Sequence, residues 1–579
     1  MRRCGRVGRR RGRIPGLPGR VAPTALGNGP GHRWGAVDES IASVWEQVAD
    51  AVPAATALVQ GTRRLTWAEL DERAARLAGA LAARGVGPGG RVAVDLYNCI
   101  EYLEVVYAAL KLRAVPINVN YRYQEGELVY LLDDAEADVV VLHGSLGERL
   151  VGAAPRLRRP IRLIEVPAGA PMVDEAEEYE TLLAACEPAP RIPRSGDDRL
   201  ILYTGGTTGY PKGVVWRHED VLGPPIAVNG WLAFDLEIPA GAAAAAKLAA
   251  QVVAEGREPR SLPAAPLMHT TALFKSLATL LLGGCVVFAT SRSLDADELC
   301  RLIGEERVVD LSIVGDAFAR PILAALERAR AEGRPYDLSS LRRIGSAGVV
   351  WSPEVKAGIA RFAPQVSFTD ILASTEGGPY ALAITRPGED PLTTRPRLTP
   401  NGRILDEEGS DVVPGSGRQG VLAASGPMPL GYLNDPERTA RTWKVIDGVR
   451  HVISGDMATI DGDGNVTLLG RGSEVVNTGG EKVYVEEVEQ VILTHPAVAD
   501  AIVVGVPDAR LGHRVVAVVA RRPGATLSAQ AVIDHVGTVL ADHKRPRHVV
   551  LVEEVRRSPS GKADRSWAKA VATEPAGTT

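Results

Sequence analysis

The segment Tyr203–Gly213, YTGGTTGYPKG, combines the residue types that bind phosphate groups. Its glycines let the backbone approach a ligand closely, its threonine hydroxyls and backbone amides donate hydrogen bonds, and Lys212 adds a positive charge. The segment is not a Walker A motif, because that motif reads GxxxxGK[ST], whereas Lys212 follows a proline and precedes a glycine. The segment therefore predicts a phosphate site of a different kind from that of P-loop ATPases and kinases.

Six later segments also place polar or charged side chains among glycines and other small residues. In chain order they are APLMHT, GSAG, DILASTEGG, SGDMATIDGDGNVTLLGR, NTGGEKVYVEEVE and RSPSGKAD. Glu376 and Asp456 contribute carboxylates and Lys562 contributes a positive charge among these small residues. Taken one at a time, each residue has an ordinary alternative, such as a loop carboxylate, a turn cap or, for Lys562, an exposed lysine.

Together, and in this order, the seven segments resemble the motif set of the adenylate-forming enzymes, which include acyl-CoA synthetases, luciferases and the adenylation domains of peptide synthetases. The resemblance extends from about Asp38 to Trp567. It implies that a carboxylic acid is activated with ATP and Mg²⁺. Because this reaction brings two anions together, alignment and charge neutralisation must supply most of the catalysis.

The resemblance assigns roles to particular residues. The ATP/AMP site that it implies consists of Thr204, Gly205, Gly206, Thr207, Thr208, Gly209, Lys212, Gly345, Ser346, Ala347, Asp370, Ser374, Thr375, Asp456, Arg471 and Lys562. The residues that it implies for catalysis are Lys562, Glu376, Thr204, Lys212 and His269. Thr204–Gly209 would hold the β- and γ-phosphates and move to release pyrophosphate, and Glu376 would bind the metal. Thr375 would touch the α-phosphate, Asp456 and Arg471 would grip the ribose, and residues 345–348 would line the adenine and acyl pocket.

Further roles concern the acyl site, the movement of the small domain and the coenzyme A step. His269 resembles a histidine at the mouth of the acyl site, and Lys562 would bridge the carboxylate and the phosphate after rotation of a small domain. The loop implied for the coenzyme A step contains Gly479, Gly480, Glu481 and Lys482. The hinge is expected at Arg471–Ser473, where Ser473 departs from the Asp or Lys common in the family, and Val485 replaces a frequent proline.

The elements that must position these residues read as an α/β fold. Strand, helix and strand alternate through GGRVAVDL, CIEYLEVVYAALKLRAV and ADVVVLHG, which predicts mostly parallel sheets with helices. A β-rich subdomain and a small, mobile α+β domain are expected to follow. The predicted divisions are a basic disordered tail or over-extended start at 1–36, a large domain at 37–470, a small domain at 471–567 and a loose tail at 568–579.

Net charge, hydropathy and cysteine content limit the expected binding partners and cellular location of the protein. A formal charge of -4 favours neither nucleic acid nor anionic lipid, and no apolar run reaches the ~18 residues of a membrane span. The five scattered cysteines form no CxxC pair, so they are expected to be reduced thiols in a cytoplasmic protein. The expected partners are a small carboxylic acid, ATP and coenzyme A, and the sequence leaves homo-oligomerisation open.

Finer matches resemble actinobacterial synthetases of steroid side-chain acids and long-chain fatty acids. They include YTGGTTGYPKGVVWRHED, LSIVGDAFARP and RSPSGKADRSWAK. The expected function is therefore a stand-alone, AMP-forming acyl-CoA ligase of lipid metabolism or steroid catabolism. The alternative is an acyl-AMP ligase that loads a separate carrier protein, and the sequence does not choose between the two. A non-catalytic relative is disfavoured because Lys562, Glu376 and Asp456 are all present.

Overall fold

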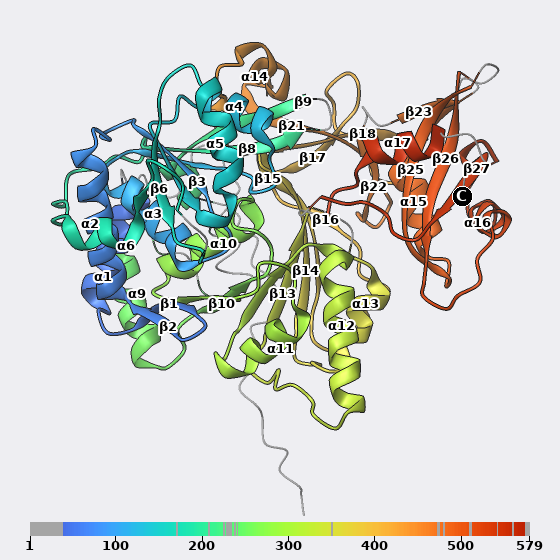
Figure 1. Cartoon of the computed structure of the whole chain (residues 1–579). Coiled ribbons are helices and arrows are strands. Elements are labelled where there is room, and N and C mark those ends of the chain that lie inside the picture. The colour runs from blue at the N-terminus through green and yellow to red at the C-terminus, as the bar shows by residue number, and fades with distance from the viewer. Residues whose placement is uncertain are drawn as a thin grey trace, which may run out of the picture.

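The computed structural model contains four β-sheets with helices packed on them (Figure 1). It describes residues 39–169, 172–206, 209–223, 226, 234, 236, 239, 241–348, 351–471, 475–478, 481–508, 512–540, 542–558 and 561–573. The basic tail predicted at 1–36 lies outside this part of the chain. Among the helices of the described residues, none is long and apolar enough to cross a membrane.

The first sheet has nine strands and carries much of the candidate site along one edge. In spatial order its strands are β16 (Arg397–Leu398), β15 (Gly377–Thr385), β14 (Ser367–Ser374), β13 (Arg343–Ala347), β12 (Asp310–Ile313), β10 (Arg260–Pro263), β11 (Cys285–Phe288), β1 (Thr56–Gln60) and β2 (Arg63–Thr66). The strands from β14 to β1 run parallel, and β15, β16 and β2 are antiparallel to their neighbours.

The second sheet has eight strands and is also parallel through most of its width. Its spatial order is β19 (Gly431–Tyr432), β9 (Gly209–Arg217), β8 (Arg199–Gly206), β4 (Val115–Asn118), β3 (Arg91–Asp95), β5 (Val139–His143), β6 (Arg162–Val166) and β7 (Glu177–Glu178). The prediction of mostly parallel sheets is confirmed for both large sheets.

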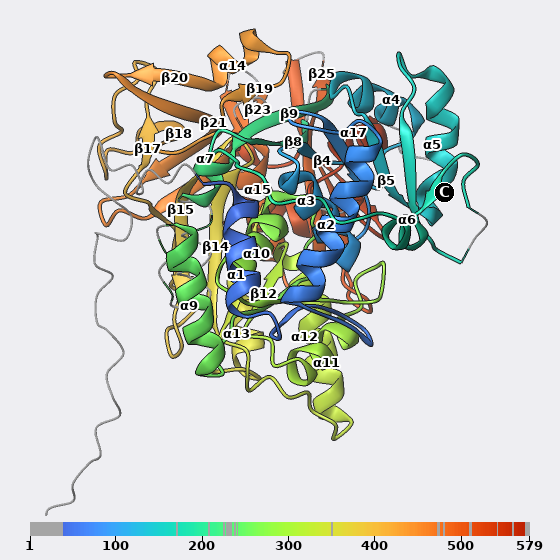
Figure 2. The same cartoon turned by 90° about the vertical axis from the view of Figure 1, so that its left-hand side faces the viewer.

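The helices cover these sheets and fill the space between them (Figure 2). They are α1 (Ile41–Ala51), α2 (Trp67–Ala83), α3 (Ile100–Lys111), α4 (Glu125–Asp134), α5 (Gly147–Ala153), α6 (Tyr179–Ala185), α7 (His218–Leu222), α9 (Ala242–Ala254), α10 (Thr270–Leu281), α11 (Ala296–Glu305), α12 (Gly315–Ala331), α13 (Pro353–Ala360) and α14 (Pro436–Thr442). The spacing of Thr66 and Glu69 in the sequence predicts a capping box, and α2 begins with one, in which the two side chains satisfy each other's backbone amides.

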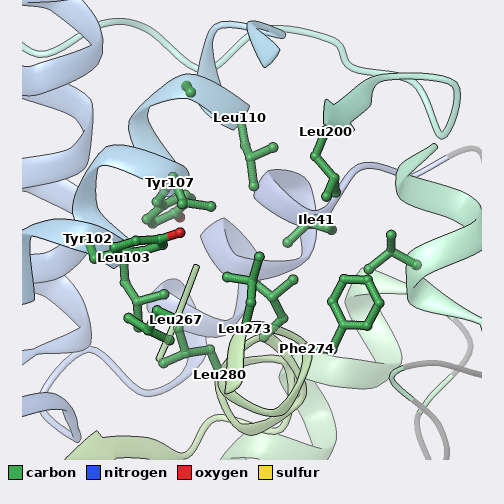
Figure 3. Close-up of a cluster of buried hydrophobic side chains, with 14 of the residues drawn as sticks. Ile41, Tyr102, Leu103, Tyr107, Leu110, Leu200, Leu267, Leu273, Phe274 and Leu280 are labelled. Carbon is green, nitrogen blue, oxygen red and sulfur yellow. The ribbon is translucent and has the colours of Figure 1, made fainter. Parts of the chain in front are cut away.

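Helix α10 lies between the two large sheets. One of its faces packs against β10 and β12, and the other meets the apolar side chains of α1 and α3 (Figure 3). In that view Leu273 and Phe274 of α10 lie near Ile41 of α1. Because α10 starts immediately after His269, this packing fixes the position of the histidine relative to both sheets.

The third sheet is antiparallel and confirms the predicted β-rich subdomain. It consists of β17 (Gly402–Leu405), β18 (Gln419–Ser425), β21 (Val449–Ile460) and β20 (Trp443–Ile446), with β22 (Val466–Arg471) paired to β21.

The fourth sheet and three helices form a small α+β unit beside the larger part of the chain (Figure 1). It contains β24 (Glu481–Tyr484), β23 (Val475–Thr478), β26 (Gly512–Arg521), β25 (Val498–Asp508), β27 (His548–Val552), α15 (Val485–Leu493), α16 (Ala529–Gly537) and α17 (Arg565–Thr573). The prediction of a loose tail from residue 568 is wrong as far as Thr573. Ala568 and Ala572 are buried on one face of α17 against β25, and this burial stabilises the helix.

Candidate functional site

The predicted phosphate-binding segment forms the end of a hairpin between β8 and β9. Thr204 lies opposite Lys212 across the hairpin, and Gly206 lies opposite Gly209. Residues directly opposite in an antiparallel pair share one face of the sheet, so the side chains of Thr204 and Lys212 leave the hairpin on the same face. Thr207 and Thr208, at the turn itself, lie outside the described residues.

The candidate metal ligand lies close to this hairpin. Thr375 and Glu376 form the turn between β14 and β15, and Tyr432 of β19 donates a hydrogen bond of 2.8 Å from its hydroxyl to Oε1 of Glu376. The Nζ atom of Lys212 lies 5.3 Å from the centre of the same tyrosine ring, within the range of a cation–π interaction. Tyr432 therefore links Lys212 to Glu376, and no motif around Tyr432 points to this role.

The turn that carries Glu376 is held in place by its neighbours. Nε1 of Trp216 donates a hydrogen bond of 3.1 Å to the carbonyl oxygen of Thr375, and the hydroxyls of Ser374 and Tyr380 lie 2.9 Å apart. The Trp216 ring also meets Phe274 edge to face, with ring centres 5.6 Å apart. The turn is thus tied to β9, which carries Lys212, and through Trp216 to α10, which begins directly after His269.

A buried asparagine joins the hairpin to the histidine. Nδ2 of Asn118 donates to the carbonyl oxygens of Tyr203, at 2.9 Å, and of Met268, at 2.6 Å. These two residues directly precede Thr204 and His269. Sequence reasoning missed Asn118, because nothing in the local pattern shows that the end of β4 lies between the two segments.

Lys562 acts electrostatically on His269 although the two residues come from different parts of the chain. Burial is the main cause that lowers the pKa of His269 to about 4, and the positive charge of Lys562 is the second. Among the contacts of the described residues, Nε2 of His269 is buried without a hydrogen-bond partner. His269 is therefore neutral at neutral pH, and the lysine of the small unit lies close enough to affect it electrostatically.

A tight turn presents Lys562, whose side chain is exposed. The amide of Lys562 donates to Oγ of Ser558 at 3.1 Å, and the amide of Gly561 donates to the carbonyl oxygen of Ser558 at 2.8 Å. Arg557 donates to the carbonyl oxygen of Gly561 at 3.0 Å and forms an ion pair of 2.6 Å with Asp500 on β25. The turn is thereby anchored to the sheet of the small unit.

The two residues predicted to grip a ribose lie opposite each other. Asp456 of β21 pairs with Arg471, the last residue of β22. The backbone amide of Asp456 donates to Oγ of Ser454 at 3.0 Å, and the residue is half-buried. The structure thus brings the predicted pair together in the backbone. The remaining predicted hinge residues, Gly472 and Ser473, lie outside the described residues.

The predicted lining of the adenine and acyl pocket is the end of β13. Gly345, Ser346 and Ala347 are its last three residues, and Oγ of Ser346 accepts a hydrogen bond of 2.8 Å from the amide of Gly315 at the start of α12. Ser346 therefore faces α12, and Gly345 faces the opposite side, toward α10.

Asp370, another predicted nucleotide residue, is ion-paired inside the protein. Its carboxylate contacts the ammonium of Lys356 on α13, and that ammonium lies 5.2 Å from the centre of the Trp351 ring. Burial raises the pKa of Asp370 against the opposing effect of Lys356. The carboxylate is directed to α13, and its role in nucleotide binding stays a prediction.

The loop predicted for the coenzyme A step belongs to a hairpin between β23 and β24. Thr478 lies opposite Glu481, and Asn477 lies opposite Lys482. Gly479 and Gly480 fall outside the described part of the chain, so their predicted role is a hypothesis.

The donor set fits a metal ion that arrives with a nucleotide. In the described part of the chain no group of three or more His, Cys, Asp or Glu side chains could hold a metal ion by itself. Magnesium usually keeps several water ligands and binds through one or two carboxylates together with substrate phosphates. Glu376, beside a predicted phosphate site, could provide such a carboxylate.

Comparison with known proteins gives consistent matches over nearly the whole chain. The family model of the AMP-binding enzyme matches residues 45–433, and that of the AMP-binding enzyme C-terminal domain matches residues 487–562. The chain is 39% identical over 545 residues to the 3-oxocholest-4-en-26-oate--CoA ligase of Rhodococcus rhodochrous, covering 92% of this chain and 95% of the relative. It is also 39% identical over 549 residues to the medium/long-chain-fatty-acid--CoA/3-oxocholest-4-en-26-oate--CoA ligase of Mycobacterium marinum. This match covers 92% of this chain and 96% of the relative.

Solved structures agree on the fold. The anthranilate CoA ligase AuaEII in complex with anthranoyl-AMP is similar with a TM-score of 0.78 and 21% identity, over 92% of this chain and 97% of that chain. ATP-bound MatB from Rhodopseudomonas palustris is similar with a TM-score of 0.73 and 25% identity, over 91% of this chain and 98% of that chain. From the motif order, the arrangement of the site and these matches, the chain belongs to the AMP-binding enzyme family.

Proposed function

We propose that this chain is an ATP-dependent acyl-CoA ligase that activates a hydrophobic carboxylic acid as its acyl-adenylate and then transfers the acyl group to coenzyme A. The observation that carries the proposal is geometric: Tyr432 donates to Glu376 and lies against Lys212, so the candidate metal ligand lies beside the candidate phosphate hairpin. The positive charge of Lys562, on the small unit, also acts on His269. A lysine that reaches the site from a separate unit can supply charge at the reacting groups in one step and leave for the next.

In the first half-reaction, a carboxylate oxygen of the acid attacks the α-phosphorus of ATP, and the bond to the β-phosphate breaks to release pyrophosphate. Thr204 and Lys212 on the hairpin would bind the outer phosphates, and Lys562 would reduce the repulsion between the carboxylate and the α-phosphate. Neutral His269 adds no charge at neutral pH. When bound at Glu376, Mg²⁺ would screen the phosphate charge.

In the second half-reaction, the thiol of coenzyme A attacks the acyl carbon. A carbon–sulfur bond forms, the acyl–oxygen bond breaks, and AMP leaves with the oxygen that came from the acid. The thiol proton passes to solvent, because AMP is a good leaving group and the scheme requires no dedicated base. Between the two steps the small unit would turn about residues 471–473 and bring the loop at 479–482 toward the site.

The acid that we propose is a long-chain fatty acid or a steroid side-chain acid. The names of the two curated relatives described above support this substrate class, since each names a carboxylic acid with a large apolar body. We place the enzyme in the cytoplasm, with ATP and coenzyme A as its small-molecule partners.

Purified protein should be supplied with MgATP and a panel of short-, medium- and long-chain acids and steroid side-chain acids, each with and without coenzyme A. The proposal predicts AMP and pyrophosphate only when an acid is present, and acyl-CoA when coenzyme A is added. An adenylate that accumulates but never reaches coenzyme A would instead indicate a carrier protein as the acceptor. Formation of ADP would contradict the proposal.

A further inference from the structure

A charged cluster lies buried between α10 and the nine-stranded sheet. It consists of Lys275 on α10, Asp310 on β12 and Arg343 on β13, whose side chains are at most 2% exposed. Nζ of Lys275 lies 3.4 Å from Oδ2 of Asp310, and Nη1 of Arg343 lies 3.5 Å from Oδ1. Two cationic side chains thus share one carboxylate at distances longer than those of a strong charge-assisted hydrogen bond.

The hydrogen-bonding groups of this cluster are incompletely satisfied. Among the described residues, Nε and Nη1 of Arg343 and Oδ2 of Asp310 have no hydrogen-bond partner. Burial lowers the pKa of Lys275 to about 7 and also lowers that of Arg343, which shows how strongly the site disfavours its own positive charge. A buried guanidinium with unpaired N–H groups requires an acceptor, and the described part of the chain supplies none to Nε and Nη1.

The cluster borders the predicted acyl pocket. Arg343 and Gly345 are two residues apart on β13 and face the same side of the sheet, and a Cβ atom built on Gly345 would lie 2.6 Å from Nη2 of Arg343. On α10, Lys275 follows His269 by six residues, which corresponds to roughly 9 Å along the helix. The guanidinium therefore lies between α10 and the sheet, deeper than the histidine and beside the pocket glycine.

The two faces of α10 are chemically different. Leu273 and Leu280 face the apolar core of Figure 3, whereas Lys275 and Thr279 face polar groups of the sheet. Thr279 continues this polar face with a hydrogen bond of 2.9 Å to Ser261. An acyl pocket that followed α10 inward from His269 would therefore end at hydrogen-bond donors.

Building on the proposed function, we propose that Arg343, held by Asp310 beside Lys275, determines specificity by donating hydrogen bonds to a second oxygen atom of the substrate acid. The substrate class is then a hydrophobic acid that carries a carbonyl or carboxylate group distant from the carboxylate that is activated. A plain alkyl acid would leave the Arg343 donors unpaired and would react more slowly.

The test compares acids of equal length, from octanoic to hexadecanoic acid, each with its α,ω-dicarboxylic acid and an oxo-acid bearing the carbonyl near the far end. Wild-type enzyme should show kcat/KM for AMP formation at least tenfold higher with one of the oxygenated acids than with the plain acid of the same length. The Arg343→Met variant should lose this preference by lowering only the activity toward the oxygenated acid. The dicarboxylic and oxo-acids together distinguish an anionic group from a neutral acceptor.

Two controls separate specificity from folding. Arg343→Lys should retain part of the preference, and Arg194→Met, which removes a different buried, ion-paired arginine, should leave it unchanged. Equal loss of activity toward all acids in Arg343→Met, or no preference in the wild type, would overturn the inference. Binding of the same acids by calorimetry gives a second readout, and equal affinities for the three kinds of acid would also overturn it. Absence of AMP formation with every acid would contradict the proposed function. In that case the calorimetric affinities for the three kinds of acid would still test the role of Arg343.

Discussion

The large part of the chain and the small unit contribute to the site in different ways. Glu376 lies in a turn that is held by Trp216 and Tyr432, and the segment before His269 is held by Asn118. Lys562, by contrast, is exposed on a turn whose anchor, the ion pair of Arg557 with Asp500, lies within the small unit. The comparison indicates that the candidate site groups of the large part are held in place by their neighbours, and we expect the charge of Lys562 to be delivered to them for the first half-reaction.

The largest effect is expected from removing the delivered charge. Lys562→Met should lower the rate of acyl-adenylate formation by about 10²–10³-fold, the range seen when one group that stabilises a transition state is removed. Transfer of the acyl group from a chemically prepared adenylate to coenzyme A should stay close to that of the wild type. Lys569→Met, which removes another exposed lysine of the small unit, is the matched control. Equal loss in both half-reactions would contradict a role specific to the first.

A fixed nucleotide contact should affect binding more than chemistry. Asp456→Ala should raise KM for ATP by about tenfold, since the lost hydrogen bonds to ribose hydroxyls are worth roughly 1–2 kcal/mol. Steady-state kinetics at saturating acid measure this effect. Asp463→Ala, which changes an exposed turn carboxylate near β22, should leave KM unchanged. A normal KM in Asp456→Ala would remove this residue from the nucleotide site.

The anchor of the lysine turn should matter less than the lysine itself. Arg557→Ala should lower kcat for adenylate formation by about fivefold and leave KM for ATP unchanged, because the turn loses its contacts with Asp500 and Gly561. Arg547→Ala removes a more exposed arginine of the same unit and should have little effect. If instead KM for ATP rises while kcat is unchanged, the turn does not position Lys562.

A smaller effect is expected from the tyrosine that holds Glu376. Tyr432→Phe removes one hydrogen bond, worth about 1 kcal/mol, and should raise the Mg²⁺ concentration needed for half-maximal activity by about fivefold. Tyr336→Phe removes a similar tyrosine–carboxylate hydrogen bond, to Asp297, and serves as the control. An unchanged Mg²⁺ dependence in Tyr432→Phe would show that this hydrogen bond does not orient a metal ligand.

The smallest effect concerns the ionisation of His269. Since burial is the first cause of its lowered pKa and Lys562 the second, Lys562→Met should raise the pKa only part of the way back toward 6.5. In the wild type the imidazole should stay neutral from pH 8 down to pH 6 and become protonated as the pH falls toward 4. NMR titration of labelled histidines would measure both values. An identical pKa in wild type and variant would mean that Lys562 does not lie near His269 in solution.

Motifs within one segment could be predicted from sequence, whereas partners brought from distant segments could not. The capping box of Thr66 and Glu69, the parallel strands and the order of the seven segments are local signals, and the first two are confirmed in the structure. Tyr432 and Asn118 were missed because their roles depend on the order of strands in the second sheet. The helix that ends at Thr573 was missed because only two small residues, Ala568 and Ala572, form its buried face.

The central claim, that the acid is activated as a mixed anhydride with AMP, can be tested most directly with an acid labelled with ¹⁸O in its carboxylate. One oxygen of the acid must leave with AMP when the thiol attacks the acyl carbon. The account predicts that AMP from a complete reaction carries one ¹⁸O atom per turnover, as measured by mass spectrometry. Unlabelled AMP, or label found in pyrophosphate or in inorganic phosphate, would contradict it.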